Sequence, residues 1–150
     1  DLAQLQARGI SHIITATNRM KPLHDCLHYL VLDFPDAADQ MLLDAFDEAH
    51  EFMDQARAAG GKVLVHCMMG QSRSVSVVVS YIMRCERCSN VDALARIREM
   101  RPDAKPIEAF QQQLALYHEM NCKVDTEHPE VDRMRRSLKK IPVLKTAAKK

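Results

Sequence analysis

The residues best suited to chemistry lie together at positions 65–74, which read VHCMMGQSRS. A short apolar run ends at His66, Cys67 follows directly, and Arg73 comes after five intervening residues. A loop that joins a strand to a helix can turn successive backbone N–H groups inward, and the helix N-terminus adds partial positive charge. This order of residues predicts a site for a tetrahedral oxyanion such as phosphate or sulfate, with a cysteine at its floor.

Each fixed position of this segment has a physical role in such a site. The backbone dipoles favour the Cys67 thiolate, so we expect its pKa well below the free-thiol value of about 8.5. Arg73 offers a planar fork that matches two phosphate oxygens, and Gly70 permits a tight turn without a Cβ near the anion. A structural cysteine beside an unrelated arginine is the alternative, and it leaves the full order of residues unexplained. The expected phosphate-binding residues are Met68, Met69, Gly70, Gln71, Ser72 and Arg73.

The elements that must position this loop alternate between strands and helices. Apolar, β-branched runs at 12–17, 28–32 and 62–66 predict strands, the last one fully buried. Helices are predicted at 2–8, 39–59 and 89–100 and from Pro106 onward. Residues 75–82 have the composition of a strand, but we expect a buried helix because the anion loop requires one behind it. The sequence thus predicts an α/β fold with a central, largely parallel sheet flanked by helices.

The composition excludes several classes of protein. Lys and Arg total 21 against 20 for Asp and Glu, and a net charge of +1 gives no general attraction to nucleic acid or membranes. No uncharged apolar run approaches the length of about 18 residues that a transmembrane helix needs. The five cysteines, an odd number, favour a reducing intracellular setting. Cys85 and Cys88 form a C-x-x-C pair that we interpret as unconnected thiols, because further zinc ligands at suitable spacing are lacking.

The C-terminal segment differs in charge from the rest of the chain. From position 133 to 150 there are no acidic residues and eight basic ones, Arg133, Arg135, Arg136, Lys139, Lys140, Lys145, Lys149 and Lys150. We interpret 123–150 as a solvated, partly helical basic linker, with contact to a negatively charged partner such as RNA as the alternative. Residues 1–122 then form the catalytic domain.

The loop resembles that of the atypical dual-specificity phosphatases, within the cysteine-based protein tyrosine phosphatase superfamily. The family motif, His-Cys-x-x-Gly-x-x-Arg-Ser or Thr, is matched by His66, Cys67, Gly70, Arg73 and Ser74. Residues 101–126 are similar to the subgroup of dual-specificity phosphatase twelve and its fungal counterparts. The resemblance implies a cysteine-phosphatase fold, phosphoprotein substrates bearing phosphotyrosine, phosphoserine or phosphothreonine, and no cofactor or metal.

The subgroup resemblance carries further expectations and three departures. It implies a role in ribosome assembly with a pre-ribosomal particle as partner, and we expect a cytoplasmic and nuclear location and no membrane. The strands that usually precede the helix at Leu2 are lacking, so a sheet edge is left open or those residues precede this numbering. Ile107 and Thr15 stand where many relatives carry Asn, so some bracing hydrogen bonds are expected to differ.

In the expected reaction the Cys67 thiolate attacks phosphorus and forms a cysteinyl-phosphate intermediate. Ser74 donates a hydrogen bond to the sulfur and aids its departure, and His66 braces the loop through a hydrogen bond to backbone. A loop aspartate protonates the leaving oxygen and then activates water. Two rival functions are a phosphatase-fold binding module that acts without catalysis and a rhodanese-like sulfurtransferase, and the latter fits the Arg73-Ser74 ending poorly.

Asp36 is the aspartate that we assign as general acid, with Asp33 as the alternative. Both follow the strand at 28–32, and Asp36 lies further out on the loop, after Pro35. Asp36 also precedes Cys67 by 31 residues, close to the separation in similar dual-specificity enzymes. Asp39, the third carboxylate of this loop, is expected to cap the following helix.

Overall fold

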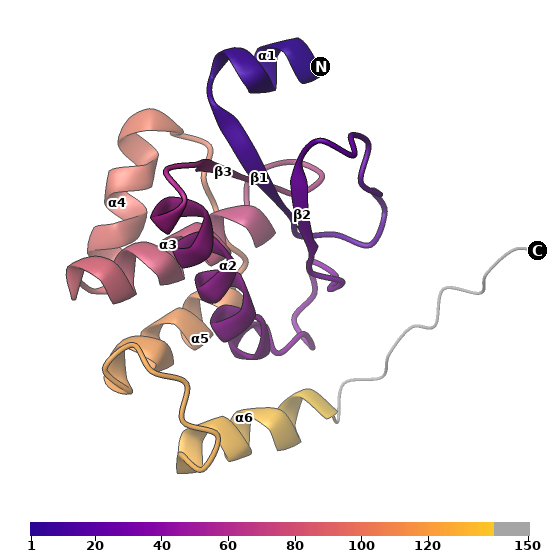
Figure 1. Cartoon of the computed structure of the whole chain (residues 1–150). Helices are drawn as coiled ribbons and strands as arrows, with labels where there is room; N and C mark the ends of the chain where they lie inside the picture. Colours follow the sequence, from indigo (N-terminus) through magenta and orange to yellow (C-terminus); the bar gives the residue numbers. More distant parts are fainter. Residues whose placement is uncertain (140–150) are drawn as a thin grey trace, which may run out of the picture.

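The order of strands and helices follows the predicted α/β pattern. A computed structural model describes residues 1–139, and its elements are α1 (Leu2–Ala7), β1 (Ile10–Thr15), β2 (His28–Val31), η1 (Leu42–Ala45), α2 (Phe46–Ala58), β3 (Lys62–His66), α3 (Arg73–Glu86), α4 (Asn90–Met100), α5 (Glu108–Glu119) and α6 (Pro129–Lys139). Figure 1 shows α2 to α5 gathered beside the sheet, with α1 and α6 at opposite ends of the molecule. The predicted fold class is therefore confirmed.

The three strands in the described part of the chain form one parallel sheet in the order β2-β1-β3. β1 is central, and its Ile14 lies opposite Leu30 of β2 and Val65 of β3. Ile14 is fully buried, whereas every residue of β3 keeps some exposure. The predicted full burial of residues 62–66 is wrong, because β3 pairs along only one of its edges with a described strand.

Helix α3 resolves the conflict between composition and structure at residues 75–82. Val75, Val77 and Val79 are buried in it although β-branched residues favour strands. The helix packs against β3, α2, α4 and α5, and burial on several sides outweighs the small helical penalty of valine. The predicted buried helix is confirmed, and it begins at Arg73, directly behind the loop.

The helix predicted for residues 39–59 begins later than expected. The 3₁₀ turn η1 comes first and α2 follows it, and neither has a side-chain cap of its own. Instead, the buried Gln113 side chain of α5 accepts hydrogen bonds from the backbone N–H groups of Leu42 at 2.6 Å and Leu43 at 3.2 Å. The predicted cap by Asp39 is wrong, because a residue from a distant helix satisfies these N–H groups.

Part of the predicted linker is a helix that packs on the domain. In α6, Val131 is fully buried, and Met134 and Leu138 lie against the core. Arg135 forms two hydrogen bonds of 2.8 and 2.5 Å with the Asp44 carboxylate of η1. The helical part that the prediction includes is thus found at Pro129–Lys139, but this helix is docked on the domain and not solvated on all sides. Other basic residues of the predicted linker lie outside the described residues, namely Lys140, Lys145, Lys149 and Lys150.

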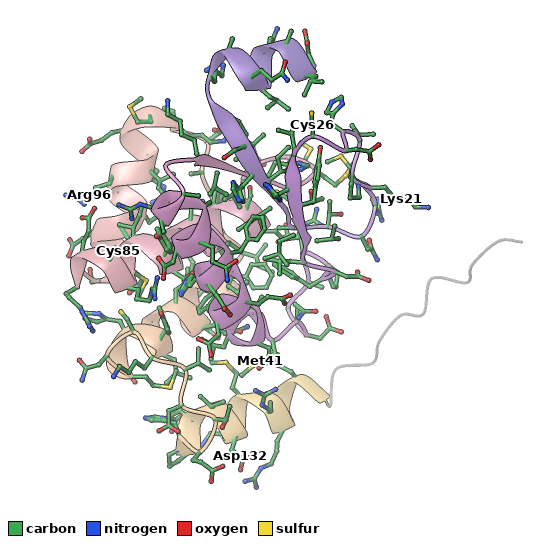
Figure 2. The ribbon with its side chains drawn as sticks, viewed as in Figure 1. Lys21, Cys26, Met41, Cys85, Arg96 and Asp132 are labelled. Atoms are coloured by element: carbon green, nitrogen blue, oxygen red, sulfur yellow. The ribbon has the colours of Figure 1, made fainter. Side chains whose placement is uncertain are left out.

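The five cysteines are all free thiols. Cys67 and Cys122 are buried, while Cys26 and Cys85 are exposed. Figure 2 shows Cys26 on the loop between β1 and β2, away from Cys85 on α3. Within residues 1–139, no cluster of three or more His, Cys, Asp or Glu side chains is suited to a metal ion. None of the helices in that range is both long and apolar enough to cross a bilayer.

Candidate active site

Cys67 follows β3 directly, and its sulfur faces the loop that leads to α3. The Sγ atom accepts a hydrogen bond from the Gly70 backbone N–H at 3.3 Å and lies 3.2 Å from Ser74 Oγ. Gly70 has a φ of +68°, in the left-handed region that favours glycine, and this turn brings its N–H back toward the sulfur. The loop between β3 and α3 thus closes around a thiol that is 7% exposed.

Opposing effects set the pKa of the Cys67 thiol. Burial raises the pKa, because a thiolate loses hydration in the interior. Hydrogen bonds from the hydroxyl and backbone N–H of Ser74 and from the Gly70 N–H, together with the charge of Arg73, lower it. The lowering effects prevail, so the pKa lies below the ordinary value for a thiol and the nucleophilic thiolate is favoured.

Arg73 places a positive charge at the first residue of α3. Its Nε is buried and has no hydrogen-bond partner within residues 1–139. A buried N–H without a partner costs free energy, about 1–3 kcal/mol or more for a charged group. An oxyanion in the loop would accept this hydrogen bond, and the N-terminal N–H groups of the helix add further positive potential.

His66 is held by its neighbours on both sides. Its Nε2 lies 2.9 Å from Oγ1 of Thr15, the residue opposite it on β1. Burial lowers the pKa of His66, and a hydrogen bond to the Cys67 backbone opposes this effect. The imidazole is therefore kept neutral, and this arrangement supports a bracing role. The Thr15 hydroxyl provides one of the two contacts.

The structure brings Asp36, and not Asp33, to the loop. Ser72 Oγ donates a hydrogen bond of 2.6 Å to Asp36 Oδ1. Both carboxylates are exposed, but Asp33 forms no hydrogen bond or ion pair with any other residue of the described chain. Of these two carboxylates, Asp36 is therefore the one that contacts the loop that carries Cys67.

The segment between α4 and α5 supports the loop through contacts that the sequence reasoning missed. Arg101 donates from Nε to the Gly70 carbonyl at 2.8 Å and from Nη2 to the Met69 carbonyl at 3.4 Å. Arg101 packs so closely that a Cβ at Gly70 would lie 2.7 Å from its Nη2. A backbone hydrogen bond of 2.7 Å joins Lys105 N to Gln71 O. The sequence shows an arginine directly before Pro102 in a short segment between two helices. That pattern does not indicate which backbone groups the arginine contacts.

Ile107 replaces the expected side-chain brace with its backbone. Its N–H donates to Ser72 Oγ at 3.0 Å, so the loop is tied to the start of α5 although Asn is lacking there. The brace at this position is therefore a backbone N–H and not a side chain.

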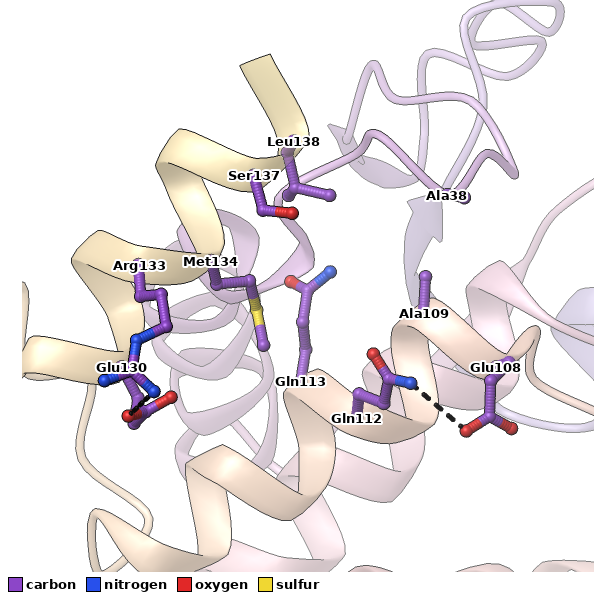
Figure 3. Close-up of a pocket in the computed structure, with 10 residues that line it drawn as sticks. All are labelled: Ala38, Glu108, Ala109, Gln112, Gln113, Glu130, Arg133, Met134, Ser137 and Leu138. Carbon is purple, nitrogen blue, oxygen red and sulfur yellow. Dashed lines mark hydrogen bonds and ion pairs between the residues drawn. The ribbon is translucent and has the colours of Figure 1, made fainter. Parts of the chain in front are cut away.

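Two of the cavities in the described part of the chain are not lined by Cys67. One of about 500 Å³ separates α5 from α6, and Figure 3 shows Met134 and Leu138 of α6 and Gln113 of α5 among the residues that line it. It reaches the loop that carries Asp36 only at Ala38 and none of residues 67–73 lines it. The other, of about 370 Å³, lies along β3 and is lined by Met68 and Met69, among others.

Comparison with known proteins matches the same part of the chain. Residues 1–120 match the family described as "Dual specificity phosphatase, catalytic domain". Dual specificity protein phosphatase 1 of Arabidopsis thaliana is 39% identical over 111 residues, which cover 73% of this chain and 56% of that protein. The chain spans about half the length of the curated relatives it matches.

Two solved structures have the same fold. DUSP15 is 30% identical with a TM-score of 0.76, over 95% of this chain and 85% of that chain. The Yvh1 phosphatase domain from Chaetomium thermophilum is 28% identical with a TM-score of 0.73, over 83% of this chain and 88% of that chain. The sequence comparison and the structure comparison thus both match phosphatase domains.

Proposed function

Because the chain belongs to the family of dual-specificity phosphatase catalytic domains, we propose that it hydrolyses phosphate monoesters on phosphoproteins. The family predicted from the loop motif is confirmed, while its placement near subgroup twelve stays a prediction. The observation that carries the proposal is the Cys67 sulfur, which is held by Gly70 and Ser74 in the same loop as the unpaired Arg73 Nε.

In the first step the Cys67 thiolate attacks phosphorus, the S–P bond forms, and the P–O bond to the substrate side chain breaks. Backbone N–H groups of residues 68–73 and the Arg73 guanidinium stabilise the charge on the equatorial oxygens. Asp36 donates its proton to the leaving oxygen, so that the dephosphorylated hydroxyl departs without charge.

In the second step water attacks the phosphocysteine and the S–P bond breaks. The Asp36 carboxylate takes the proton from the water, and Ser74 stabilises the departing thiolate by a hydrogen bond from its hydroxyl. Inorganic phosphate leaves the loop, and both the thiolate and the protonated Asp36 are restored. Phosphate or sulfate at sufficient concentration is expected to occupy the same loop.

The substrates in this proposal include phosphotyrosine, phosphoserine and phosphothreonine. Met68 and Met69 follow Cys67 and are 48% and 71% exposed, so flexible thioethers form the rim beside the nucleophile. A soft, shallow rim accepts side chains of different length. Peptides of one sequence that carry each of the three phosphoresidues test this breadth, and activity on phosphotyrosine alone would contradict it.

A Cys67→Ser variant tests the catalytic role, with Cys85→Ser as its matched control because Cys85 is exposed on α3. We expect Cys67→Ser to lose on the order of 10³-fold or more of phosphopeptide hydrolysis, while Cys85→Ser retains it. Acid quenching of the wild-type reaction should trap phosphate on Cys67. Normal turnover by Cys67→Ser would overturn the proposed function.

The alternative function, a binding module in ribosome assembly, rests on the subgroup resemblance alone. The basic segment 133–150 and a pre-ribosomal partner belong to this alternative, while the proposed cytoplasmic and nuclear location applies to both functions. Complementation of cells that lack the protein separates the two functions. If a Cys67→Ser chain without turnover restores growth, binding carries the role; if it does not, catalysis is required.

A further inference from the structure

Ser72 occupies the N-cap position of α3 but does not cap the helix. An N-cap serine ordinarily accepts a hydrogen bond from an N–H of the first helical turn, and this contact contributes stability. Here the Ser72 side chain makes no such bond. The residue is nevertheless buried, and its carbonyl accepts from both the backbone N–H and the hydroxyl of Ser76, at 2.8 and 2.7 Å. Its backbone is therefore fixed while its hydroxyl is turned to other partners.

The direction of the hydrogen bonds at Ser72 is set by its two partners. The backbone N–H of Ile107 can only donate, so Ser72 Oγ accepts this bond, which measures 3.0 Å. The hydroxyl proton is then left for Asp36 Oδ1, at 2.6 Å. A directed chain thus runs from the start of α5 through Ser72 to the carboxylate.

The backbone around Asp36 is anchored on both sides, but the carboxylate itself is not. Phe34 is buried and its ring packs edge-to-face on Phe110, and the carbonyl of Gln40 accepts a hydrogen bond of 2.8 Å from Gln113. The Asp36 side chain is exposed between these anchors. Within residues 1–139, Ser72 is its one hydrogen-bonding partner.

We propose that Ser72 is a positioning residue for the general acid and determines which oxygen of Asp36 transfers the proton. This inference rests on the proposed phosphatase function. Because Oδ1 accepts the Ser72 proton, the acidic proton is carried by Oδ2, which is left to face the leaving oxygen. The diverted hydroxyl also leaves the first N–H groups of α3 unblocked for the phosphate oxygens.

A leaving-group comparison tests this role, since a general acid matters most when the leaving group is poor. We expect Ser72→Ala to lower kcat by about 10- to 100-fold on phenyl phosphate and phosphoserine peptides. The loss on dinitrophenyl phosphate, whose leaving group needs no proton, should be several-fold smaller. The basic limb of the pH–rate profile should weaken in Ser72→Ala, in the same direction as the loss expected for Asp36→Asn. Ser72→Thr, which keeps a hydroxyl, should recover activity on the poor leaving groups.

Ser76→Ala is the matched control, because Ser76 is also buried and its hydroxyl also bonds to this loop, but it does not touch Asp36. Its effect should be the same for good and poor leaving groups. In the Asp36→Asn background, Ser72→Ala should add no further dependence on the leaving group. Ser72→Gly repeats the test if Ser72→Ala does not fold.

Equal losses on good and poor leaving groups in Ser72→Ala would overturn the inference and reduce Ser72 to a structural part of the phosphate loop. The proposed function would survive that result, provided that Cys67→Ser is inactive. Turnover by Cys67→Ser would instead remove the phosphatase mechanism itself, so the two failures are distinguishable.

Discussion

Cys67 and Cys122 are two buried thiols with opposite pKa shifts. Burial raises the pKa of both, but at Cys67 the hydrogen bonds of Ser74 and Gly70 and the charge of Arg73 prevail and lower it. We therefore expect iodoacetamide to alkylate Cys67 faster than Cys122 at neutral pH, with the midpoint of its rate profile at lower pH. Mass spectrometry of each modified peptide across the pH range measures this. A common midpoint for the two cysteines would contradict the activated nucleophile.

Asp36 and Asp33 also form a matched pair, three positions apart on one exposed loop. Only Asp36 contacts the phosphate loop, through Ser72. We expect Asp36→Asn to slow the hydrolysis of poor leaving groups by about 10²-fold and to abolish the basic limb of the pH–rate profile, because the proton donor is lost. Asp33→Asn should match the wild type in both measurements. The reverse pattern would mean that the general acid lies three residues earlier in the chain.

The segment between α4 and α5 acts on the loop through Arg101, which donates hydrogen bonds to two loop carbonyls. In a trans peptide group the C=O and N–H bonds point in opposite directions. By holding these carbonyls away from the sulfur, Arg101 keeps the N–H groups of the same peptides directed toward an anion in the loop. We expect Arg101→Met to weaken tungstate binding and raise KM by about 10-fold, since a hydrogen bond from a charged group contributes about 1.5–3 kcal/mol.

Arg96→Met controls for the loss of a cation from this region, because Arg96 is an exposed arginine of α4 that pairs with Glu86. The rise in the thermal unfolding midpoint with increasing tungstate concentration measures tungstate binding in each of the two variants. If both bind tungstate as the wild type does, the carbonyl contacts of Arg101 do not position the loop.

Helix α6 contributes to stability through one apolar face. Val131 is fully buried against the core, whereas Val91 of α4 is 70% exposed. We expect Val131→Ala to lower the free energy of unfolding by about 2 kcal/mol, and Val91→Ala to change it little, because only the first leaves a cavity. Urea denaturation measures both. Hydrolysis of small aryl phosphates should persist in Val131→Ala, since α6 carries none of the groups used in the mechanism.

At the scale of the whole molecule, the sequence predicted those features whose structure depends on residues only a few positions apart. The strand, loop and helix around residues 65–74 are of this kind, since β3 ends at His66 and α3 begins at Arg73. Sequence reasoning failed where distant segments meet, as at Gln113, which caps Leu42 from 71 positions away. The Ser72–Asp36 contact spans 36 positions, and only the assembled sheet and helices create it. The burial of Val131 likewise depends on a surface made by other elements.

His50 joins three helical elements in the core. From α2, its Nε2 lies 2.8 Å from Ser80 Oγ of α3, and its ring packs on Phe46 and near Tyr117 of α5. Burial lowers the pKa of His50 to about 4, the charge of Arg84 acts in the same direction, and Asp54 opposes them. The folded protein therefore keeps this imidazole neutral well below the ordinary pKa of about 6.5.

We expect the free energy of unfolding to fall as the pH decreases from about 6.5 to about 4. Above this window His50 is neutral in both states, and within it the unfolded chain binds a proton that the folded core excludes. A difference of about 2.5 pKa units corresponds to a loss of about 3 kcal/mol across the window. Urea denaturation at successive pH values measures the slope. His50→Gln, which keeps a hydrogen-bonding group toward Ser80, should flatten the slope, while His118→Gln on the exposed face of α5 should not. A slope unchanged in His50→Gln would assign the acid destabilisation to other groups.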